Sequence, residues 1–257
     1  MSSFKTLVAA SILTAGCGLI SEQASAAGAS VDLLEKSWSH DGLFGTYDRS
    51  AAQRGFQVYR EVCAGCHGLE FIAFRNLADL GFNESEVKAL AAEYEVTDGP
   101  DDEGEMFERP ARPSDHLPSP FPNENAARAS NNGAYPPDLS LITKARPNGT
   151  NYIYSLMMGY GDAPADVEIG DAMNYNAYFP GHQIAMAQPL YEESVEYADG
   201  TAATLEQHAN DIAVFLTWAA EPKLEERKGT GLKAMMFLVL LTGLFYATKR
   251  KIWSDIH

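Results

Sequence analysis

Two cysteines three positions apart, with a histidine directly after the second, have the spacing of a chemical site. They are Cys63, Cys66 and His67, in the stretch Glu61-Val-Cys-Ala-Gly-Cys-His-Gly-Leu-Glu70. Such a pair suits a redox disulfide, half of a zinc site, or the anchor of a covalently bound haem. Each of these would give the protein a different function.

A haem anchor explains these residues better than the other two sites. A thioredoxin-like pair needs a strand–helix context, which the sequence lacks, and structural zinc needs four ligands. Cys17 lies in a segment that we expect to be removed, so only this pair remains, with no metal-spaced histidine pair elsewhere. Two thiols at this spacing add to the vinyl groups of one porphyrin and aim His67 at the iron. We therefore predict one covalently bound haem c, with the second ring nitrogen of His67 donating to a backbone carbonyl.

The second axial ligand of the iron has two candidates in one turn-rich loop. A thioether from Met186 would raise the reduction potential, whereas ligation by His182 would lower it. Two further methionines fit core packing, and two further histidines are expected to face solvent: Met157, Met158, His208 and His257.

Both ends of the chain carry apolar segments that we expect to lie outside the haem domain. At the start, Lys5, an apolar run over residues 7–20 and Ala24-Ser-Ala26 predict a cleaved secretory signal peptide, residues 1–26. A looser resemblance of Leu13-Thr-Ala-Gly-Cys17 to a lipoprotein acceptor site is the alternative.

Residues 229–248 predict a single transmembrane helix near the other end, with a buried core helix as the alternative. Lys249-Arg-Lys251 follows it directly, and the positive-inside rule then places residues 249–257 in the cytoplasm. Residues 27–228 would form a periplasmic domain on a bacterial inner membrane.

The part between the two apolar ends is strongly acidic. Residues 28–220 contain 11 Lys and Arg against 30 Asp and Glu. Such a surface repels nucleic acid and attracts basic proteins, mainly through the rate of encounter. No nucleic-acid partner is expected.

The segments that would position the haem ligands are mostly helical. Residues 50–62 place Gly55, Tyr59 and Cys63 four apart, on one face of a helix that ends at the cysteine pair. Residues 204–220 predict a strongly amphipathic helix. Shorter helices are predicted at residues 84–93, 138–145 and 151–159.

The rest of the chain is predicted to be extended or irregular. Residues 27–48 form an extended leader, with Trp38 and Phe44 as packing points. Residues 98–137 are acidic and then rich in proline and asparagine, which predicts a long irregular surface loop.

Several segments, in this order, together resemble the cytochrome c1 family, the haem-bearing subunit of the cytochrome bc1 (quinol–cytochrome c oxidoreductase) complex. The likeness runs from about residue 35 to residue 253. Its carriers are Arg54-Gly-Phe-Gln-Val-Tyr-Arg-Glu-Val-Cys-Ala-Gly-Cys-His67, Asp98-Gly-Pro100, Gly104-Glu-Met-Phe107, Asn131-Asn-Gly-Ala-Tyr-Pro-Pro-Asp-Leu-Ser140, Tyr178-Phe-Pro-Gly181, Ile184-Ala-Met-Ala187 and Trp218-Ala-Ala-Glu-Pro222.

This resemblance implies a mostly α fold: a class I cytochrome c-like haem domain with long loop insertions, plus one C-terminal transmembrane helix. It implies Met186 as the sixth ligand of the iron. Some bacterial relatives carry an extra cysteine pair before this methionine; this chain has none, so the loop is expected to be held by packing alone. Further haem contacts are implied for Asn131, Pro136 and Pro137, and contacts near the propionates for Arg146 and Tyr152.

The resemblance also implies one-electron transfer, with no substrate bond broken on this chain. The electron would come from a Rieske iron–sulfur subunit, beside cytochrome b, and go to a basic soluble or tethered cytochrome c in a respiratory or photosynthetic complex. A free-standing membrane-anchored shuttle remains an alternative. A haem enzyme or sensor, which needs an open iron position, is another.

Overall fold

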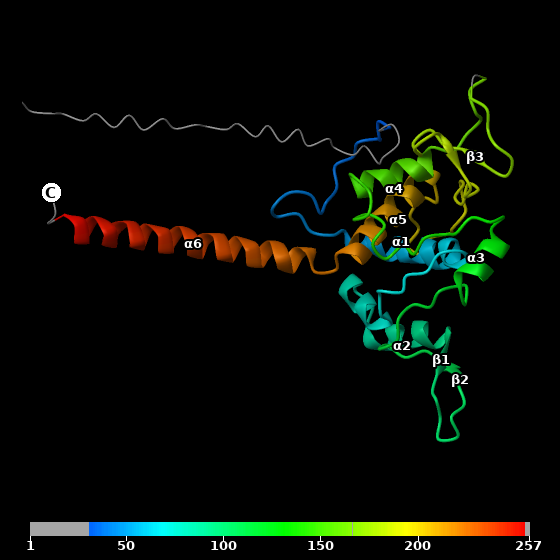
Figure 1. Ribbon diagram of the computed structural model, residues 1–257, viewed down its shortest axis with the longest axis horizontal. Helices are drawn as coiled ribbons and strands as arrows, with labels where there is room; N and C mark the ends of the chain where they lie inside the picture. Colours follow the sequence, from blue (N-terminus) through cyan, green and yellow to red (C-terminus); the bar gives the residue numbers. More distant parts are fainter. Residues whose placement is uncertain (1–30, 166, 255–257) are drawn as a thin grey trace, which may run out of the picture.

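Two helices cross at the centre of the body of the protein (Figure 1). They are α1, Arg49–Glu61, and α5, Leu205–Ala220. The computed structural model describes residues 31–165 and 167–254, so the predicted signal peptide lies outside the described residues. The other helices are α2 Glu84–Ala92, α3 Glu124–Ser130, α4 Gly149–Met158 and α6 Leu224–Trp253, with short 3-10 helices η1 Cys63–Gly65 and η2 Phe74–Leu80. The mostly α fold class is confirmed.

The crossing of α1 and α5 depends on one glycine. A Cβ atom at Gly55 would lie 2.0 Å from the backbone oxygen of Asp211. Around this point Phe56 and Tyr59 pack against Phe215, with ring centroids 5.6 and 5.9 Å apart. The helix face on which the sequence places Gly55 and Tyr59 is therefore the face that contacts α5.

Replacing this glycine is expected to destabilise the protein. Gly55→Ala should lower the free energy of unfolding by about 1–3 kcal/mol, because the added methyl group meets backbone that has no space to yield. Denaturant unfolding of the haem-loaded chain measures the change. Gly161→Ala is the control, because a Cβ there meets nothing within 4 Å. Equal stability of the two variants would contradict the close approach of α1 to α5 at Gly55.

A buried ion pair joins the same two helices. The guanidinium group of Arg54 contacts both carboxylate oxygens of Asp211, at 2.7 and 3.2 Å. The Asp211 side chain is fully buried, and it also accepts hydrogen bonds from Gln207 and Asn210. Arg54 extends the network to Asp199, which precedes α5, at 3.1 Å.

The chain before α1 lies against α4. Leu34 donates its backbone N–H to the Ser155 hydroxyl at 2.9 Å, and the Trp38 indole donates to the Asn151 side chain at 2.7 Å. Trp38 is buried, as predicted. The prediction for Phe44 is wrong: its side chain is 78% exposed, because residues 42–44 form a turn that points away from the core.

The prediction of a helix at residues 138–145 is wrong: in the structure this segment forms a series of turns. The Asp138 carboxylate accepts hydrogen bonds from the backbone N–H groups of Ser140 and Glu70, at 2.8 and 2.9 Å. Such side-chain bonds compete with helical ones. They tie this segment to the chain just after His67.

The loop predicted over residues 98–137 is also more regular than expected. It contains most of an antiparallel hairpin, β1 Glu95–Asp98 and β2 Phe107–Pro110, and the short helix α3. Arg109 holds the hairpin, because its guanidinium group pairs with Asp98 and, at 2.6 Å, with Asp115. A second hairpin has two-residue strands, β3 Asn174–Tyr175 and β4 Gln183–Ile184.

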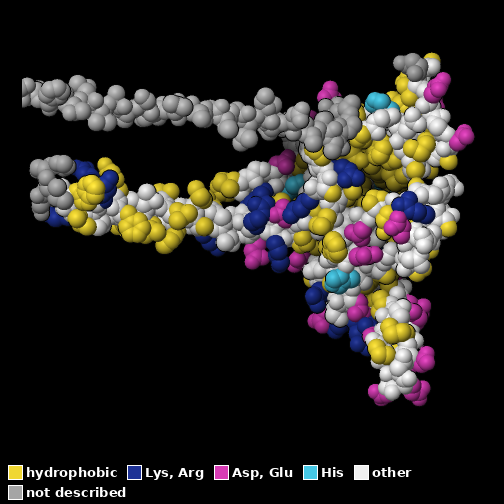
Figure 2. All heavy atoms as spheres, viewed as in Figure 1, with side chains coloured by type: hydrophobic (Ala, Val, Ile, Leu, Met, Phe, Trp, Pro, Cys, Tyr) yellow, Lys and Arg dark blue, Asp and Glu magenta, His cyan; other side chains and the backbone are white. Residues whose placement is uncertain are grey.

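The last helix projects away from the body (Figure 1). α6 extends over 30 residues, and the residues in its apolar window have a mean hydropathy of 1.6 and are not buried in the structure. Hydrophobic side chains cover the exposed part of the helix (Figure 2). The alternative of a buried core helix is therefore wrong. The helix is long and apolar enough to cross a membrane, and it begins and ends about five residues beyond the predicted span 229–248.

Candidate haem site

The cysteine pair lies in a tight turn at the end of α1. The backbone N–H groups of Cys66 and His67 both donate to the Cys63 carbonyl, at 3.1 and 2.9 Å. Both cysteines are free; Cys63 is half-buried and Cys66 is exposed. The turn thus presents two thiols and one imidazole from five consecutive residues.

The surroundings of the pair fit neither a redox thiol nor a zinc site. Burial raises the pKa of the Cys63 thiol to about 12, whereas reactive cysteines have lowered pKa values. Among residues 31–165 and 167–254, no three His, Cys, Asp or Glu side chains gather in a metal-binding group. Structural zinc needs four ligands. A covalent anchor needs only the two thiols and one axial ligand.

The His67 ring is held through one nitrogen, which leaves the other available as a ligand. Its Nδ1–H donates to the Pro137 carbonyl at 2.7 Å, which confirms the predicted hydrogen bond and leaves the lone pair on Nε2. Burial lowers the pKa of the His67 imidazole and so favours its neutral form. The Tyr59 hydroxyl donates to the His67 carbonyl at 3.0 Å and fixes the backbone of His67 to α1.

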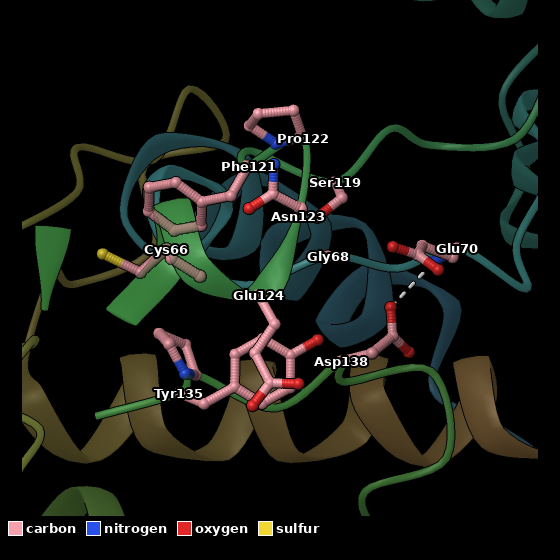
Figure 3. Close-up of a pocket in the computed structure, with 12 residues that line it drawn as sticks. Cys66, Gly68, Glu70, Ser119, Phe121, Pro122, Asn123, Glu124, Tyr135 and Asp138 are labelled. Atoms are coloured by element: carbon pink, nitrogen blue, oxygen red, sulfur yellow. Dashed lines mark hydrogen bonds between the residues drawn. The ribbon is translucent and has the colours of Figure 1, made fainter. Parts of the chain in front are cut away.

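A recess of about 120 Å³ lies beside Cys66 (Figure 3). Cys66 and Phe121 lie on one side, Glu70 and Asp138 on the other, and Tyr135 lies between them. The recess is smaller than the roughly 300 Å³ at which cofactor pockets begin. It therefore matches the margin of a larger group attached to Cys66, not a complete porphyrin pocket.

The loop that ends at Met186 is held by hydrogen bonds as well as packing, which corrects the expectation of packing alone. The Tyr160 hydroxyl donates to the Met186 carbonyl at 3.1 Å. The buried Asn176 side chain donates to the Leu156 carbonyl at 2.8 Å and so ties the loop to α4. A Cβ at Gly159 would lie 2.6 Å from the Asn176 side-chain oxygen.

The two possible sixth ligands differ in their surroundings. Met186 is half-buried and packs against the main hydrophobic core, as Cys63 does. His182 has a positive φ of 58° at a turn, its Nδ1 donates to the Ala177 carbonyl at 3.1 Å, and its ring stacks on Tyr175. These surroundings favour Met186 over His182 as the candidate for the sixth ligand of the iron.

Two other sequence predictions concern side chains outside the site. Met157 is buried, as expected for core packing. The prediction for His208 is wrong, because it is fully buried in α5 and shares a 2.8 Å hydrogen bond with the Tyr197 hydroxyl. His257 lies outside the described residues.

Two groups of predicted site residues emerge from the structure. Pro137 bonds His67, and Pro136 lines the recess beside Cys66. Asn131 ends α3, and its side chain donates to the Ala127 carbonyl at 2.7 Å; Ala127 also lines the recess. These residues form the first group, with the two cysteines.

The second group lies in the turn before α4, on α4 and in the loop region after it. The Arg146 guanidinium lies over the Tyr152 ring, 5.9 Å from its centroid. Burial raises the pKa of Tyr160, and the nearby Tyr152 and Tyr191 add to the shift. Tyr160 in turn donates its hydroxyl to the Met186 carbonyl. Within residues 31–165 and 167–254, no hydrogen bond or ring contact joins the two groups directly.

Sequence reasoning missed Tyr160 and Asn176, which support the Met186 loop. Their signal in the sequence is weak, because a single Tyr or Asn in a turn-rich region is common. Only the fold shows that both reach back to the methionine loop and to α4.

A neutral histidine directly after two free thiols, on a helical body with one membrane-length helix, defines a membrane-anchored c-type cytochrome. A family model described as the cytochrome C1 family matches residues 38–256. The chain belongs to this family, whose cofactor is a c-type haem.

Curated relatives agree with this assignment. The chain is 48% identical to "Cytochrome c1" of Rhodospirillum rubrum, over 98% of each chain. It is 52% identical to "Cytochrome c1 2, heme protein, mitochondrial" of Arabidopsis thaliana, over 84% of this chain and 71% of that protein. It is also 52% identical to "Cytochrome b-c1 complex catalytic subunit, mitochondrial" of Candida albicans, over 86% of this chain and 77% of that protein.

Proposed function

We propose that this chain is the haem-bearing electron-transfer subunit of a cytochrome bc1 complex. It accepts single electrons from a Rieske iron–sulfur subunit, beside cytochrome b, and passes them to a cytochrome c. The observation that carries the proposal is the hydrogen bond from His67 to Pro137, which leaves Nε2 with its lone pair beside two free thiols. The chain is not an enzyme on its own.

Each residue of the site has a proposed role. A bound haem supplies one-electron oxidation and reduction at its iron. Cys63 and Cys66 would hold the porphyrin through thioether bonds, and His67 and Met186 would bind its iron. The remaining residues would line the porphyrin or neutralise its propionates: Asn131, Pro136, Pro137, Arg146 and Tyr152.

The hydrogen bonds that hold His67 and Met186 support their proposed role as iron ligands. Because Pro137 fixes the His67 ring through Nδ1, the imidazole loses little freedom when Nε2 binds iron. The Met186 carbonyl is occupied by Tyr160, so the backbone of this ligand is held while its thioether remains available. A methionine ligand raises the reduction potential.

The proposed membrane topology rests on the two apolar segments near the ends of the chain. Residues 1–26 are a signal peptide, residues 27–228 the periplasmic haem domain, residues 229–248 the transmembrane segment and residues 249–257 the cytoplasmic tail. Arg250 and Lys251 in the last turn of α6 support a cytoplasmic end. A reporter active only in the cytoplasm should be active when it is fused after residue 257.

Purification of the intact assembly tests the proposed function. The chain, extracted in mild detergent with an affinity tag at its C-terminus, should bring with it a b-type cytochrome and an iron–sulfur protein. Quinol should then reduce its haem, and an inhibitor of quinol oxidation should block this reduction. A chain that purifies alone and still exchanges electrons with a cytochrome c would instead be a free-standing shuttle.

Salt should slow electron transfer to a basic cytochrome c. The tip of the β1–β2 hairpin exposes Asp101, Asp102, Glu103 and Glu105, and opposite charges accelerate encounter. Between low and physiological ionic strength we expect the second-order rate constant to fall on the order of tenfold, because exposed charges are screened. Stopped-flow oxidation of the reduced haem measures this rate.

Removing two of these charges should weaken the salt dependence. Asp102→Asn with Glu103→Gln should lower the rate at low salt and leave the rate at high salt unchanged. Glu192→Gln with Glu193→Gln, a second exposed acidic pair, is the matched control. If the rate of the parent protein is indifferent to salt, the acidic surface does not attract the partner.

A further inference from the structure

We propose that the loop at residues 39–46, here called the interfacial loop, is a second membrane contact of this protein. The side chains of Leu43 and Phe44 at its tip insert into the interfacial region of the bilayer that α6 crosses. The proposal rests on the membrane anchoring by α6 and adds a contact that the helix alone does not supply.

The tip of the interfacial loop is apolar and exposed. Leu43 is 56% exposed and Phe44 is 78% exposed, and the two are adjacent. Removing such side chains from water is favourable. Neither Leu43 nor Phe44 is buried within the body of the protein, so the fold itself does not supply this stabilisation.

Backbone hydrogen bonds and a tight turn give the interfacial loop a defined conformation. Thr46 donates its backbone N–H to the Ser39 carbonyl at 3.0 Å and so closes the loop at its base. A Cβ at Gly45 would lie 2.0 Å from the Asp41 backbone oxygen, so the chain folds tightly back on itself there. The Asp41 carboxylate accepts the backbone N–H of Trp38 at 2.9 Å. The two apolar side chains are therefore presented from a defined turn.

The loop is attached to the start of α6. The Lys228 ammonium group donates to the His40 carbonyl at 2.6 Å and to the Gly45 carbonyl at 3.4 Å. Glu225, one turn earlier, accepts the backbone N–H of Tyr47 at 2.8 Å. Figure 1 shows the chain before α1 projecting from the body alongside the first turns of α6.

This attachment sets the height of the loop relative to the membrane. The uninterrupted apolar run of α6 starts at Ala234, six residues after Lys228, which is roughly 9 Å along the helix axis. Interfacial segments bury their apolar face about 5–10 Å into the boundary between headgroups and acyl chains. The interfacial loop lies at the level where α6 would enter that boundary.

The size of the patch favours lipid over protein. Two neighbouring side chains cover far less than the roughly 800 Å² per partner that a stable protein interface buries. One aromatic and one aliphatic side chain beside a membrane helix are enough for an interfacial contact.

Spin-label accessibility in a bilayer tests the proposal. Phe44→Cys and, independently, Leu43→Cys would be labelled in the full haem-loaded chain, in nanodiscs of phosphatidylcholine and phosphatidylglycerol. Met106→Cys is the matched control, because Met106 is 59% exposed on the β1–β2 hairpin at the opposite end of the body. Leu240→Cys, 70% exposed in the middle of α6, reports on the membrane anchor itself.

We expect the ratio of collisions with oxygen to collisions with a water-soluble nickel chelate to be several-fold higher at positions 43 and 44 than at position 106. Ratios equal to that at position 106, with a high ratio at position 240, would overturn the interfacial loop while leaving the anchor intact. A low ratio at position 240 would overturn both. In the purified complex, labels at 43 and 44 that are shielded from both reagents would show a protein partner and overturn the lipid contact.

Discussion

Met186→Leu is expected to lower the reduction potential of the haem by on the order of 0.1 V or more, within the roughly 0.8 V that axial ligands span. The thioether favours the reduced iron, and leucine cannot coordinate it. Leucine has a similar volume, so the half-buried position should stay packed. The loop should also keep its place, because Tyr160 bonds the backbone carbonyl of Met186. Spectroelectrochemical titration of the purified protein measures the potential.

Two variants make this prediction specific. Met158→Leu changes another half-buried methionine, on α4, and should leave the potential unchanged. His182→Gln removes the competing imidazole, which the structure places at a turn against Tyr175. An unchanged potential in Met186→Leu together with a raised potential in His182→Gln would identify His182 as the ligand.

The second large effect is expected at the ion pair between α1 and α5. Arg54→Gln should lower the free energy of unfolding by about 3–5 kcal/mol, because it leaves the Asp211 carboxylate buried without its cation. The loss should reach the haem ligands, since α1 leads directly into the cysteine turn. Guanidinium unfolding, followed through the haem absorbance and through circular dichroism, measures the change.

An exposed ion pair on the same helix provides the control. Arg60 pairs with Glu93 at 3.2 Å, but the side chains are 33% and 56% exposed. Arg60→Gln should therefore change the free energy of unfolding by only about 1 kcal/mol or less. If Arg54→Gln is as mild as Arg60→Gln, the buried pair does not hold the helix crossing.

The helices, and the position of the cysteine pair at the end of the first one, were predictable because their signals are local. Two thiols and a histidine in five residues limit the chemistry by themselves, and the 3.6-residue periodicity places α1 and α5 within a residue or so of their observed bounds. The hydrogen bond of His67 to a carbonyl was predictable in kind, since iron-binding histidines need it. That Pro137 supplies the carbonyl depends on a contact 70 residues away.

The errors concern segments whose structure depends on distant partners. Residues 138–145 have helical composition, but the Asp138 carboxylate bonds Glu70 and draws the chain into turns. The acidic stretch after residue 98 becomes a hairpin because Arg109 pairs with two carboxylates. His208 looked solvent-facing, yet Tyr197 covers it. None of these contacts leaves a pattern in the local sequence.

The most direct test of the account is whether haem stays with the chain after denaturation. The purified protein is boiled in detergent, separated on a gel and stained for haem, and a second sample is treated with an alkylating reagent after unfolding. The account predicts a haem-stained band at the mass of the mature chain, with Cys63 and Cys66 both resistant to alkylation. A colourless band with both cysteines alkylated would contradict it.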